Sequence, residues 1–232
     1  MALRLNKNIK YLLLFLFFAY AQKTDAQHLP EGFVYLKDVI PSIEAELRYA
    51  GNHNFIGKQI PGYNQQKIII TKKAAEAIKK VQLTLNEQNL GLKIFDAYRP
   101  QQAVDFFVDW AKNINDTLKK QEFYPNVKKE HLFKEQYIAA RSGHTRGSTV
   151  DLTIIDWSSE EKKELDMGSP YDFFGPKSWV SYKNLTAKQL ENRKLLQAIM
   201  KKHNFRNYPK EWWHFTLKNE PFPDTYFNFP IE

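Results

Sequence analysis

The sequence predicts an α+β fold in a single domain, with a mostly antiparallel central sheet and helices packed against it. Its 232 residues, 43% of them hydrophobic, suffice for one sizeable core and fit one domain better than two. No internal repeat, low-complexity tract or Pro/Gly/Ser linker interrupts residues 30–232. Helical and strand patterns alternate irregularly along that stretch, which favours an antiparallel sheet flanked by helices.

The N-terminal residues have the pattern of a signal peptide. Three basic residues precede an unbroken apolar run over residues 11–20, and a small-x-small cleavage pattern ends at Ala21, with Ala26 as a second candidate. The run is half the length of about 20 residues that a membrane-spanning helix needs, so a permanent anchor is the weaker alternative. We expect an exported chain, periplasmic or secreted, without stable membrane insertion. The expected division is a signal peptide over 1–21, an extension over 22–32 and the folded domain over 33–232.

Charge and cysteine content narrow the classes of partner. The chain has no cysteine, so its core or a bound metal must stabilise it without disulfides. Its formal net charge is +8, but the lysines are interspersed with glutamates, as around Glu76, which is typical of a solvated helix face. We therefore expect no nucleic-acid partner and, at most, an anionic neighbour such as cell wall. The oligomeric state stays open.

In the N-terminal half, residues 33–39 and 44–49 are predicted to form short strands. Residues 51–63, with three glycines and a proline, are predicted to form a long loop, and a loop of that length is often functional. Thr71 is placed to cap a helix that reaches about residue 89 and stops before Gly91.

In the C-terminal half, residues 92–98 are predicted to form a strand, and Pro100 stands in the first turn of the next helix. The apolar stripe of that helix consists of Ala103, Val104, Phe107, Trp110 and Ala111. Residues 150–155 have the composition of a strand, Thr186 and Gln189 form a capping-box pattern for a helix that reaches about residue 203, and residues 212–217 form the last predicted strand.

Two of the six histidines have an acidic residue at a spacing that metal chemistry uses. His144 lies in a glycine-containing turn that leads directly into the strand carrying Asp151. On that strand Asp151 points away from the side of Val150 and Leu152, so it is free to face a cleft. With His214 as a third ligand, two imidazoles and one carboxylate would leave zinc an open position for water, as in catalytic sites.

Glu211 and Arg99 are the candidate catalytic groups beside that metal. Glu211 lies three residues before His214, and alternation along a strand would place the two on opposite faces, so we expect a bend at Pro209. A carboxylate beside the metal can take a proton from the attacking water and pass it to the leaving amine. Arg99, held extended by Pro100, would stabilise the oxyanion.

Simpler interpretations of the same residues remain open at this point. An isolated histidine is usually a surface or hydrogen-bonded core residue, and Asp151 is also suited to cap a turn. Glu211 would then be a surface acid, and Arg99 would pair with Asp96 on the surface.

Three separated motifs resemble those of the D-alanyl-D-alanine dipeptidases of the VanX type, zinc D,D-peptidases of family M15. They are Asp96-Ala97-Tyr98-Arg99-Pro100, then Ser142-x-His144-x-x-Gly147-x-Thr149-x-Asp151, then Glu211-Trp212-Trp213-His214. The likeness extends from about residue 35 to 230. The resemblance implies that His144, Asp151 and His214 bind Zn²⁺, one ion per subunit. It further implies that Glu211 is the general base and that Arg99 stabilises the transition state of D-Ala-D-Ala hydrolysis.

The resemblance also implies how both ends of the dipeptide are recognised. Ser142 would hold its C-terminal carboxylate, while Asp172 and Tyr49 would hold its free ammonium. A carboxylate that faces the ammonium favours a dipeptide over a longer chain.

Two departures from the family pattern stand out. Gly143 and Thr149 occupy positions where relatives often have serine and alanine, which alters the edge of the pocket. The export signal differs from the cytoplasmic location of members that serve vancomycin resistance, so cell-wall peptide turnover or D-alanine scavenging is the expected role.

Two alternatives accompany this interpretation. The first is a peptidoglycan D,D- or L,D-carboxypeptidase on a related fold and metal set. The second is a non-catalytic wall-binding or metal-binding module. The presence of Asp172 speaks against the first, and the presence of Glu211 and Arg99 against the second.

Overall fold

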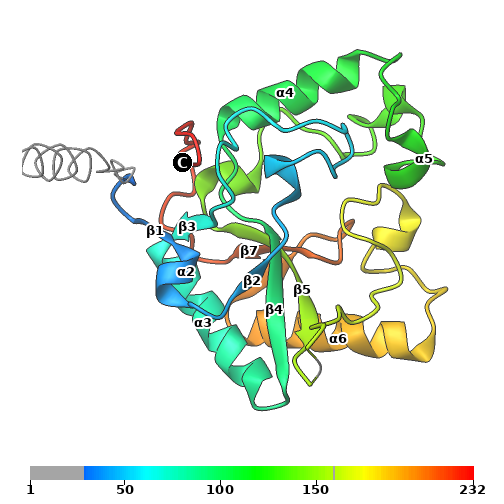
Figure 1. Ribbon diagram of the computed structural model, residues 1–232. Helices are drawn as coiled ribbons and strands as arrows, with labels where there is room; N and C mark the ends of the chain where they lie inside the picture. The colour runs from blue at the N-terminus through cyan, green and yellow to red at the C-terminus, as the bar shows by residue number, and fades with distance from the viewer. Residues whose placement is uncertain (1–28, 159) are drawn as a thin grey trace, which may run out of the picture.

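A five-stranded sheet with the strand order β2-β4-β5-β7-β6 organises the chain (Figure 1). The structure is a computed structural model that describes residues 29–158 and 160–232, so the predicted signal peptide lies outside the described residues. β2 pairs with β4 in parallel, and the other three pairings are antiparallel, which confirms the predicted fold class. The strands are β2 (Glu44–Ala45), β4 (Leu90–Asp96), β5 (Thr149–Asp156), β6 (Phe205–Asn207) and β7 (His214–Leu217).

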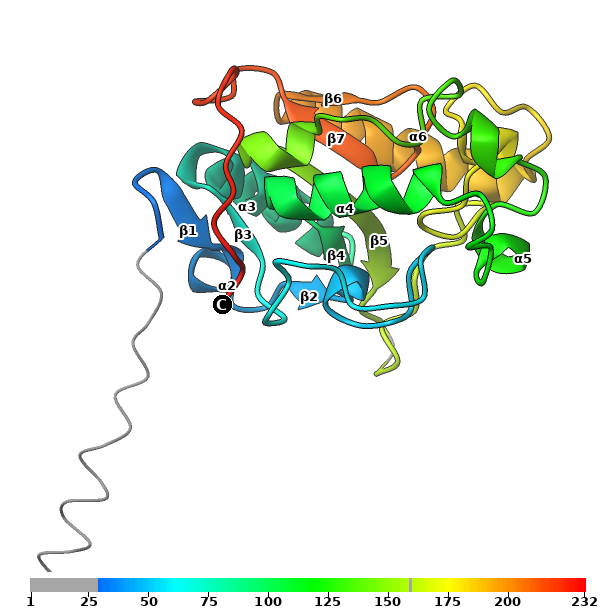
Figure 2. The same ribbon diagram turned by 90° about the horizontal axis from the view of Figure 1, so that it is seen from above.

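Helices cover both faces of this sheet (Figure 2). Two long helices, α3 and α6, pack on one face, and α4 lies over the other. Val150, Leu152 and Ile154 of β5 are fully buried in the core that α3 and α6 share with the sheet, and full burial of each contributes about 1.5–3 kcal/mol. Alternation along β5 then directs Asp151 to the α4 side. The bounds are α3 (Lys72–Asn86), α4 (Gln101–Lys112) and α6 (Ala187–Lys202).

The predicted helix caps are present. The Thr71 hydroxyl accepts a hydrogen bond from the Ala74 backbone N–H, and Thr186 and Gln189 form both bonds of the capping box. α3 nevertheless ends at Asn86, earlier than predicted, because Asn89 adopts a left-handed conformation (φ 55°) that turns the chain into β4. Pro100 is the N-cap of α4 rather than a residue of its first turn.

The strand predicted over 33–39 is half wrong. Only β1 (Phe33–Tyr35) is extended, and α2 (Leu36–Val39) is a helical turn. Leu36 and Ile40 are buried while Asp38 is exposed, and continued alternation of a strand would have placed Asp38 on the buried side. A single helical turn buries both apolar residues and leaves the carboxylate in water.

The strand predicted over 44–49 is also shorter than expected. β2 ends at Ala45, and the chain then forms the 3₁₀ turn η1 (Arg48–Ala50). This turn carries Tyr49 out of the sheet into a buried position where its hydroxyl reaches Asp172. The 51–63 segment is a loop, as predicted.

The last strand begins later than predicted. Trp212 and Trp213 are both buried and form a turn before β7, which begins at His214. β6, which the sequence analysis missed, is a three-residue edge strand that pairs with β7.

The remaining elements frame the sheet. β1 pairs with β3 in a separate two-stranded sheet. Among the described residues, no helix is both long and apolar enough to cross a membrane. The short elements are β3 (Ile69–Thr71), α5 (Lys120–Phe123), η2 (Lys129–His131), η3 (Gly143–Arg146) and η4 (Pro176–Ser178).

Candidate active site

Neighbouring elements bring His144, Asp151 and His214 together. Asp151 of β5 and His214 of β7 are directly paired across the antiparallel ladder. His144 belongs to η3, which ends at Gly147 in a left-handed conformation (φ 77°) and so folds back beside the start of β5. A Cβ at Gly147 would lie 2.2 Å from the Phe33 ring, so only glycine suits this turn.

The three side chains direct one atom each toward a common point. The distances are 3.3 Å from His144 Nε2 to Asp151 Oδ1, 3.1 Å from His214 Nδ1 to Asp151 Oδ1, and 3.3 Å between the two nitrogens. His144 and Asp151 are buried, while His214 is partly exposed toward the cleft. These three residues form the metal-binding cluster of the site.

The chemistry of this cluster fits a metal ion. His144 Nδ1 lies 2.7 Å from the Ala97 carbonyl oxygen, and in the tautomer that donates to this oxygen, Nε2 presents a lone pair to the cluster. Asp151 Oδ1 is buried, and none of the described residues donates a hydrogen bond to it. Zinc bonds of about 2.0–2.1 Å in a tetrahedron separate ligands by about 3.3 Å, which matches the observed spacing.

Electrostatic interactions within the cluster shift the pKa values of Asp151 and His214. Burial raises the pKa of Asp151, but the two imidazoles outweigh it and hold that pKa well below its usual range. For His214, burial opposes protonation, yet Asp151 and Glu211 raise the pKa to about 9. A metal cation would take the place of the proton on His214.

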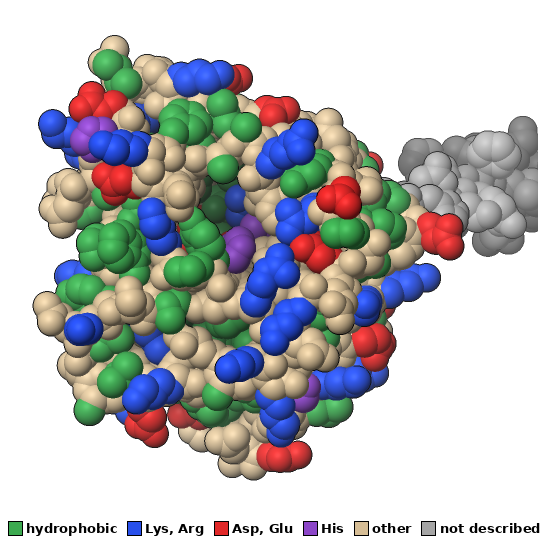
Figure 3. Space-filling model, turned by 180° about the vertical axis from the view of Figure 1, so that it is seen from behind, with side chains coloured by type: hydrophobic (Ala, Val, Ile, Leu, Met, Phe, Trp, Pro, Cys, Tyr) green, Lys and Arg blue, Asp and Glu red, His purple; other side chains and the backbone are tan. Residues whose placement is uncertain are grey.

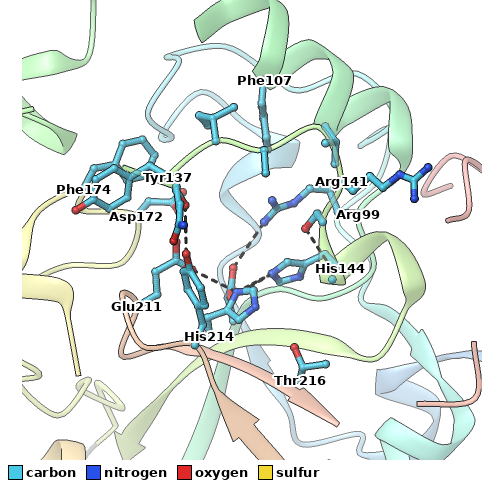
Figure 4. Close-up of a pocket in the computed structure, with 18 of the residues that line it drawn as sticks. Arg99, Phe107, Tyr137, Arg141, His144, Asp172, Phe174, Glu211, His214 and Thr216 are labelled. Atoms are coloured by element: carbon cyan, nitrogen blue, oxygen red, sulfur yellow. Dashed lines mark hydrogen bonds and ion pairs between the residues drawn. The ribbon is translucent and has the colours of Figure 1, made fainter. Parts of the chain in front are cut away.

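Glu211 lies beside the cluster rather than within it. It sits at a bend, as predicted, and its Oε2 is 3.3 Å from His214 Nδ1. Asn207 stabilises the bend because its side-chain amide donates to the carbonyl oxygens of both Glu211 and His214. Figure 4 shows Glu211 and His214 facing the same cavity.

Arg99 pairs with Asp96, but inside the molecule rather than on its surface. Its Nε is 2.9 Å and its nearer terminal nitrogen 2.8 Å from Asp96 Oδ2, and that same terminal nitrogen lies 3.7 Å from Asp151 Oδ2. The guanidinium also stacks over the rings of Tyr49 and Phe107. A fixed positive charge therefore stands next to the metal-binding cluster (Figure 4).

Asp172 and Tyr49 form a buried pair in the same cleft. The Tyr49 hydroxyl donates to Asp172 Oδ2 at 2.9 Å. Burial, and next the charge of Asp151, raise the pKa of Asp172 well above its usual range. Asp172 adopts a left-handed conformation (φ 61°), which is uncommon for a residue other than glycine, and it lines the cleft.

Ser142 is the N-cap of η3 and also lines the cleft. Its hydroxyl oxygen accepts the backbone N–H of His144 at 3.2 Å, so its own proton remains available for a ligand. All the residues singled out from the sequence thus meet around one cleft of about 650 Å³. Figure 3 shows this hollow, with histidine and basic side chains in its depth.

Gly143 and Thr149, the two positions that depart from the family pattern, lie close together at the pocket edge. A Cβ at Gly143 would lie 2.6 Å from Thr149 Oγ1, and this hydroxyl is held by a 2.9 Å hydrogen bond to Thr216 Oγ1. A side chain at position 143 and a threonine at position 149 therefore compete for the same space.

Sequence reasoning missed two groups at this site and the buried setting of a third, Asp96. Asp96 accepts a bond from the Tyr63 hydroxyl as well as from Arg99, and its place in the first motif was the available signal. Tyr171 donates to Asp151 Oδ2. An aromatic wall of the cleft had no sequence signal because such residues usually indicate core; it consists of Phe55, Phe107, Tyr137 and Phe174.

Comparison with known proteins is consistent with this geometry. The family model described as D-ala-D-ala dipeptidase matches residues 30–232. A D-alanyl-D-alanine dipeptidase of Enterococcus faecalis is 38% identical over 203 residues, covering 88% of this chain and 100% of that protein. One from Streptomyces coelicolor is 39% identical over 199 residues, covering 86% and 98%. One from Escherichia coli is 33% identical over 182 residues, covering 77% and 81%.

Proposed function

The chain belongs to the D-Ala-D-Ala dipeptidase family and is a zinc metallopeptidase, and from this premise we propose how its residues hydrolyse D-Ala-D-Ala to D-alanine. The observation that carries the proposal is the convergence of three ligand atoms, 3.1 to 3.3 Å apart, in a cleft that Glu211 and Arg99 also line.

His144, Asp151 and His214 would hold one Zn²⁺ per subunit. When bound, zinc supplies a Lewis acid that polarises the peptide carbonyl and acidifies water. The Ala97 carbonyl keeps the His144 ring oriented with Nε2 toward the cluster. The ligand atoms are two imidazole nitrogens and one carboxylate oxygen, with no cysteine sulfur. This set suits zinc, although other divalent metals would also bind in vitro.

Glu211 is the proton carrier. Its carboxylate stands 3.3 Å from a ligand atom of the cluster without belonging to the triangle, so it can contact a water in the cleft. It takes a proton from the attacking water and delivers it to the amine that leaves as the peptide bond breaks. Such groups contribute about 10²–10⁴-fold to the rate.

Arg99 stabilises the oxyanion that develops on the peptide carbonyl. Its position is fixed by Asp96, so no reorganisation is needed as charge builds up in the transition state. Only 12% of its side chain is exposed, and in such a setting a permanent charge acts more strongly than in water.

The two ends of the substrate would be held by Ser142 and by the pair of Asp172 and Tyr49. The Ser142 hydroxyl can donate to the C-terminal carboxylate. Asp172 is buried with its pKa raised, and an ammonium placed against it favours the ionised carboxylate. An acylated amino end has no positive charge to pair with the Asp172 carboxylate, so a longer peptide is disfavoured.

A blocked substrate tests this arrangement. We expect D-alanine release from D-Ala-D-Ala but not from its N-acetylated form. Asp172→Asn should raise KM for the free dipeptide about 10- to 150-fold, because a hydrogen bond to a charged group contributes about 1.5–3 kcal/mol. The matched control is Asp109→Asn on the exposed surface of α4, which should leave KM unchanged.

Other outcomes of the test with free and N-acetylated dipeptide would indicate other functions. Cleavage of the N-acetylated peptide as fast as the free one would indicate a carboxypeptidase. Failure to cleave either peptide, with zinc bound, would indicate a non-catalytic wall-binding module.

We further propose that the enzyme is exported and acts on cell-wall peptides outside the cytoplasm. The support is the basic, then apolar, then small-residue pattern of residues 1–21, which lie outside the described residues. Fractionation of expressing cells tests this: the protein should leave the cytoplasm, shortened after Ala21 or Ala26, and a full-length cytoplasmic product would contradict it.

A further inference from the structure

The two carboxylate oxygens of Asp151 have different surroundings. Oδ1 faces the two imidazoles of the metal-binding cluster. Oδ2 accepts a hydrogen bond of 3.2 Å from the Tyr171 hydroxyl and lies 3.7 Å from the Arg99 guanidinium. Oδ1 is therefore directed at the metal position, whereas Oδ2 is held by the Tyr171 hydroxyl.

Tyr171 cannot turn away from this carboxylate. It lies in the turn between β5 and α6 and is buried, with its ring stacked on Phe95 at 4.5 Å and edge-on to Trp213 at 5.5 Å. The guanidinium of Arg48 covers the same stack, 5.5 Å from the Tyr171 ring centroid. The packing leaves one direction for the hydroxyl.

The hydroxyl is not needed for that packing, because phenylalanine would fill the same space. A buried hydroxyl costs free energy unless it finds a partner, and among the described residues Asp151 is the acceptor it reaches. The phenol hydroxyl therefore finds its hydrogen-bond partner in this carboxylate.

We propose that Tyr171 is a positioning residue for the metal site: its hydroxyl holds Asp151 Oδ2 and so presents Oδ1 alone to the metal. This inference rests on the proposed function, because it assumes that His144, Asp151 and His214 bind zinc. Without the phenol, the carboxylate can rotate and share both oxygens between metal and imidazoles, which weakens the ligand set. Partners of this kind typically change metal affinity about 10- to 100-fold.

The test compares zinc affinity in wild type and Tyr171→Phe by competition with a chromophoric chelator at equilibrium. We expect affinity to fall about 10- to 100-fold in the variant, with the circular dichroism of the metal-free protein unchanged. The absorption spectrum of the Co²⁺-substituted protein should change as well, since it reports the geometry of the ligands. The matched control is Tyr98→Phe, which removes another buried hydroxyl, whose acceptor is the Phe229 carbonyl 2.9 Å away; its zinc affinity should equal wild type.

The same substitution made in Asp151→Ala separates the positioning role of Tyr171 from its role in packing. In Asp151→Ala there is no carboxylate to orient, so adding Tyr171→Phe should cause little further loss of affinity. An equal loss in both backgrounds, or wild-type affinity in Tyr171→Phe, would overturn the proposal. Wild-type protein that binds no zinc would overturn the metal site itself, whereas zinc binding that depends on His144 but not on Tyr171 would overturn the positioning role alone.

Discussion

At the scale of residues, the site concentrates ionisable groups of both signs around one point. Asp151, His144 and His214 converge within hydrogen-bond distance while Arg99 and Glu211 stand next to them. The carboxylate and the imidazoles already attract each other without metal, as the raised pKa of His214 shows. The cluster is thus preorganised, and the contributions of single residues to rate, zinc affinity and stability can be measured separately.

Glu211→Gln should lower kcat for D-Ala-D-Ala about 10²–10⁴-fold and leave zinc affinity close to wild type, since Glu211 carries the proton without ligating the metal. Steady-state kinetics and chelator competition measure the two effects. Glu191→Gln, on the exposed surface of α6, is the control. A loss of zinc binding that accounts for the whole loss of rate would instead make Glu211 a ligand.

The pKa of His214 predicts how the metal-free protein responds to pH. In the folded state it is raised to about 9, against about 6.5 when unfolded, through Asp151 and Glu211. Its contribution to stability is therefore fully present below pH 6.5 and is lost as pH rises through 9, and it amounts to about 3 kcal/mol. After chelation, the Tm should fall between pH 6.5 and 9, and this fall should be absent in His214→Gln. A metal-free Tm that rises over this range would contradict the assignment.

At the scale of elements, the contact between η3 and the first residue of β5 sets the edge of the pocket. Thr149 fills the space that a side chain at Gly143 would need, and its hydroxyl is bound to Thr216 of β7. The two positions therefore accept glycine with threonine, or a larger residue with a smaller one.

Gly143→Ser alone should destabilise the protein by about 1–3 kcal/mol, because the added side chain overpacks against Thr149. This corresponds to a fall in Tm of roughly 2–4 °C per kcal/mol at this chain length. Gly143→Ser combined with Thr149→Ala should recover most of the loss in thermal unfolding. Additive losses in the double variant would show that the two positions are not coupled.

How far the sequence predicts these elements depends on whether their signal is local. The capping box of α6 and the apolar alternation of β5 depend on neighbours in the chain, and both were confirmed. The turn that carries Tyr49 depends on a contact with Asp172 that is distant in sequence, and β6 is a strand of only three residues, so local patterns missed both. Arg99 shows the same limit: its partner Asp96 was foreseen, but the burial of both depends on how α4 and the 51–63 loop cover the sheet.

At the scale of the whole molecule, two hydrophobic clusters form the core, and the cleft adjoins one of them. One face of the sheet packs against α3 and α6 (Figure 1), while the second cluster includes Phe107 of α4 and Tyr49, which also line the cleft. The opposite face holds the cleft, to which β5, β7, η3 and the turns after β4 and β5 each contribute a functional side chain. Zinc would join groups from three of these elements, so its removal should loosen the cleft before the core.

Zinc-dependent hydrolysis is measured as D-alanine release from D-Ala-D-Ala by purified protein lacking residues 1–28, before and after chelation and again after zinc is restored. We expect release that chelation abolishes and that about one equivalent of zinc per chain restores, with no restoration in His144→Ala. Release that persists in the fully chelated protein, or that zinc restores equally in His144→Ala, would contradict this expectation.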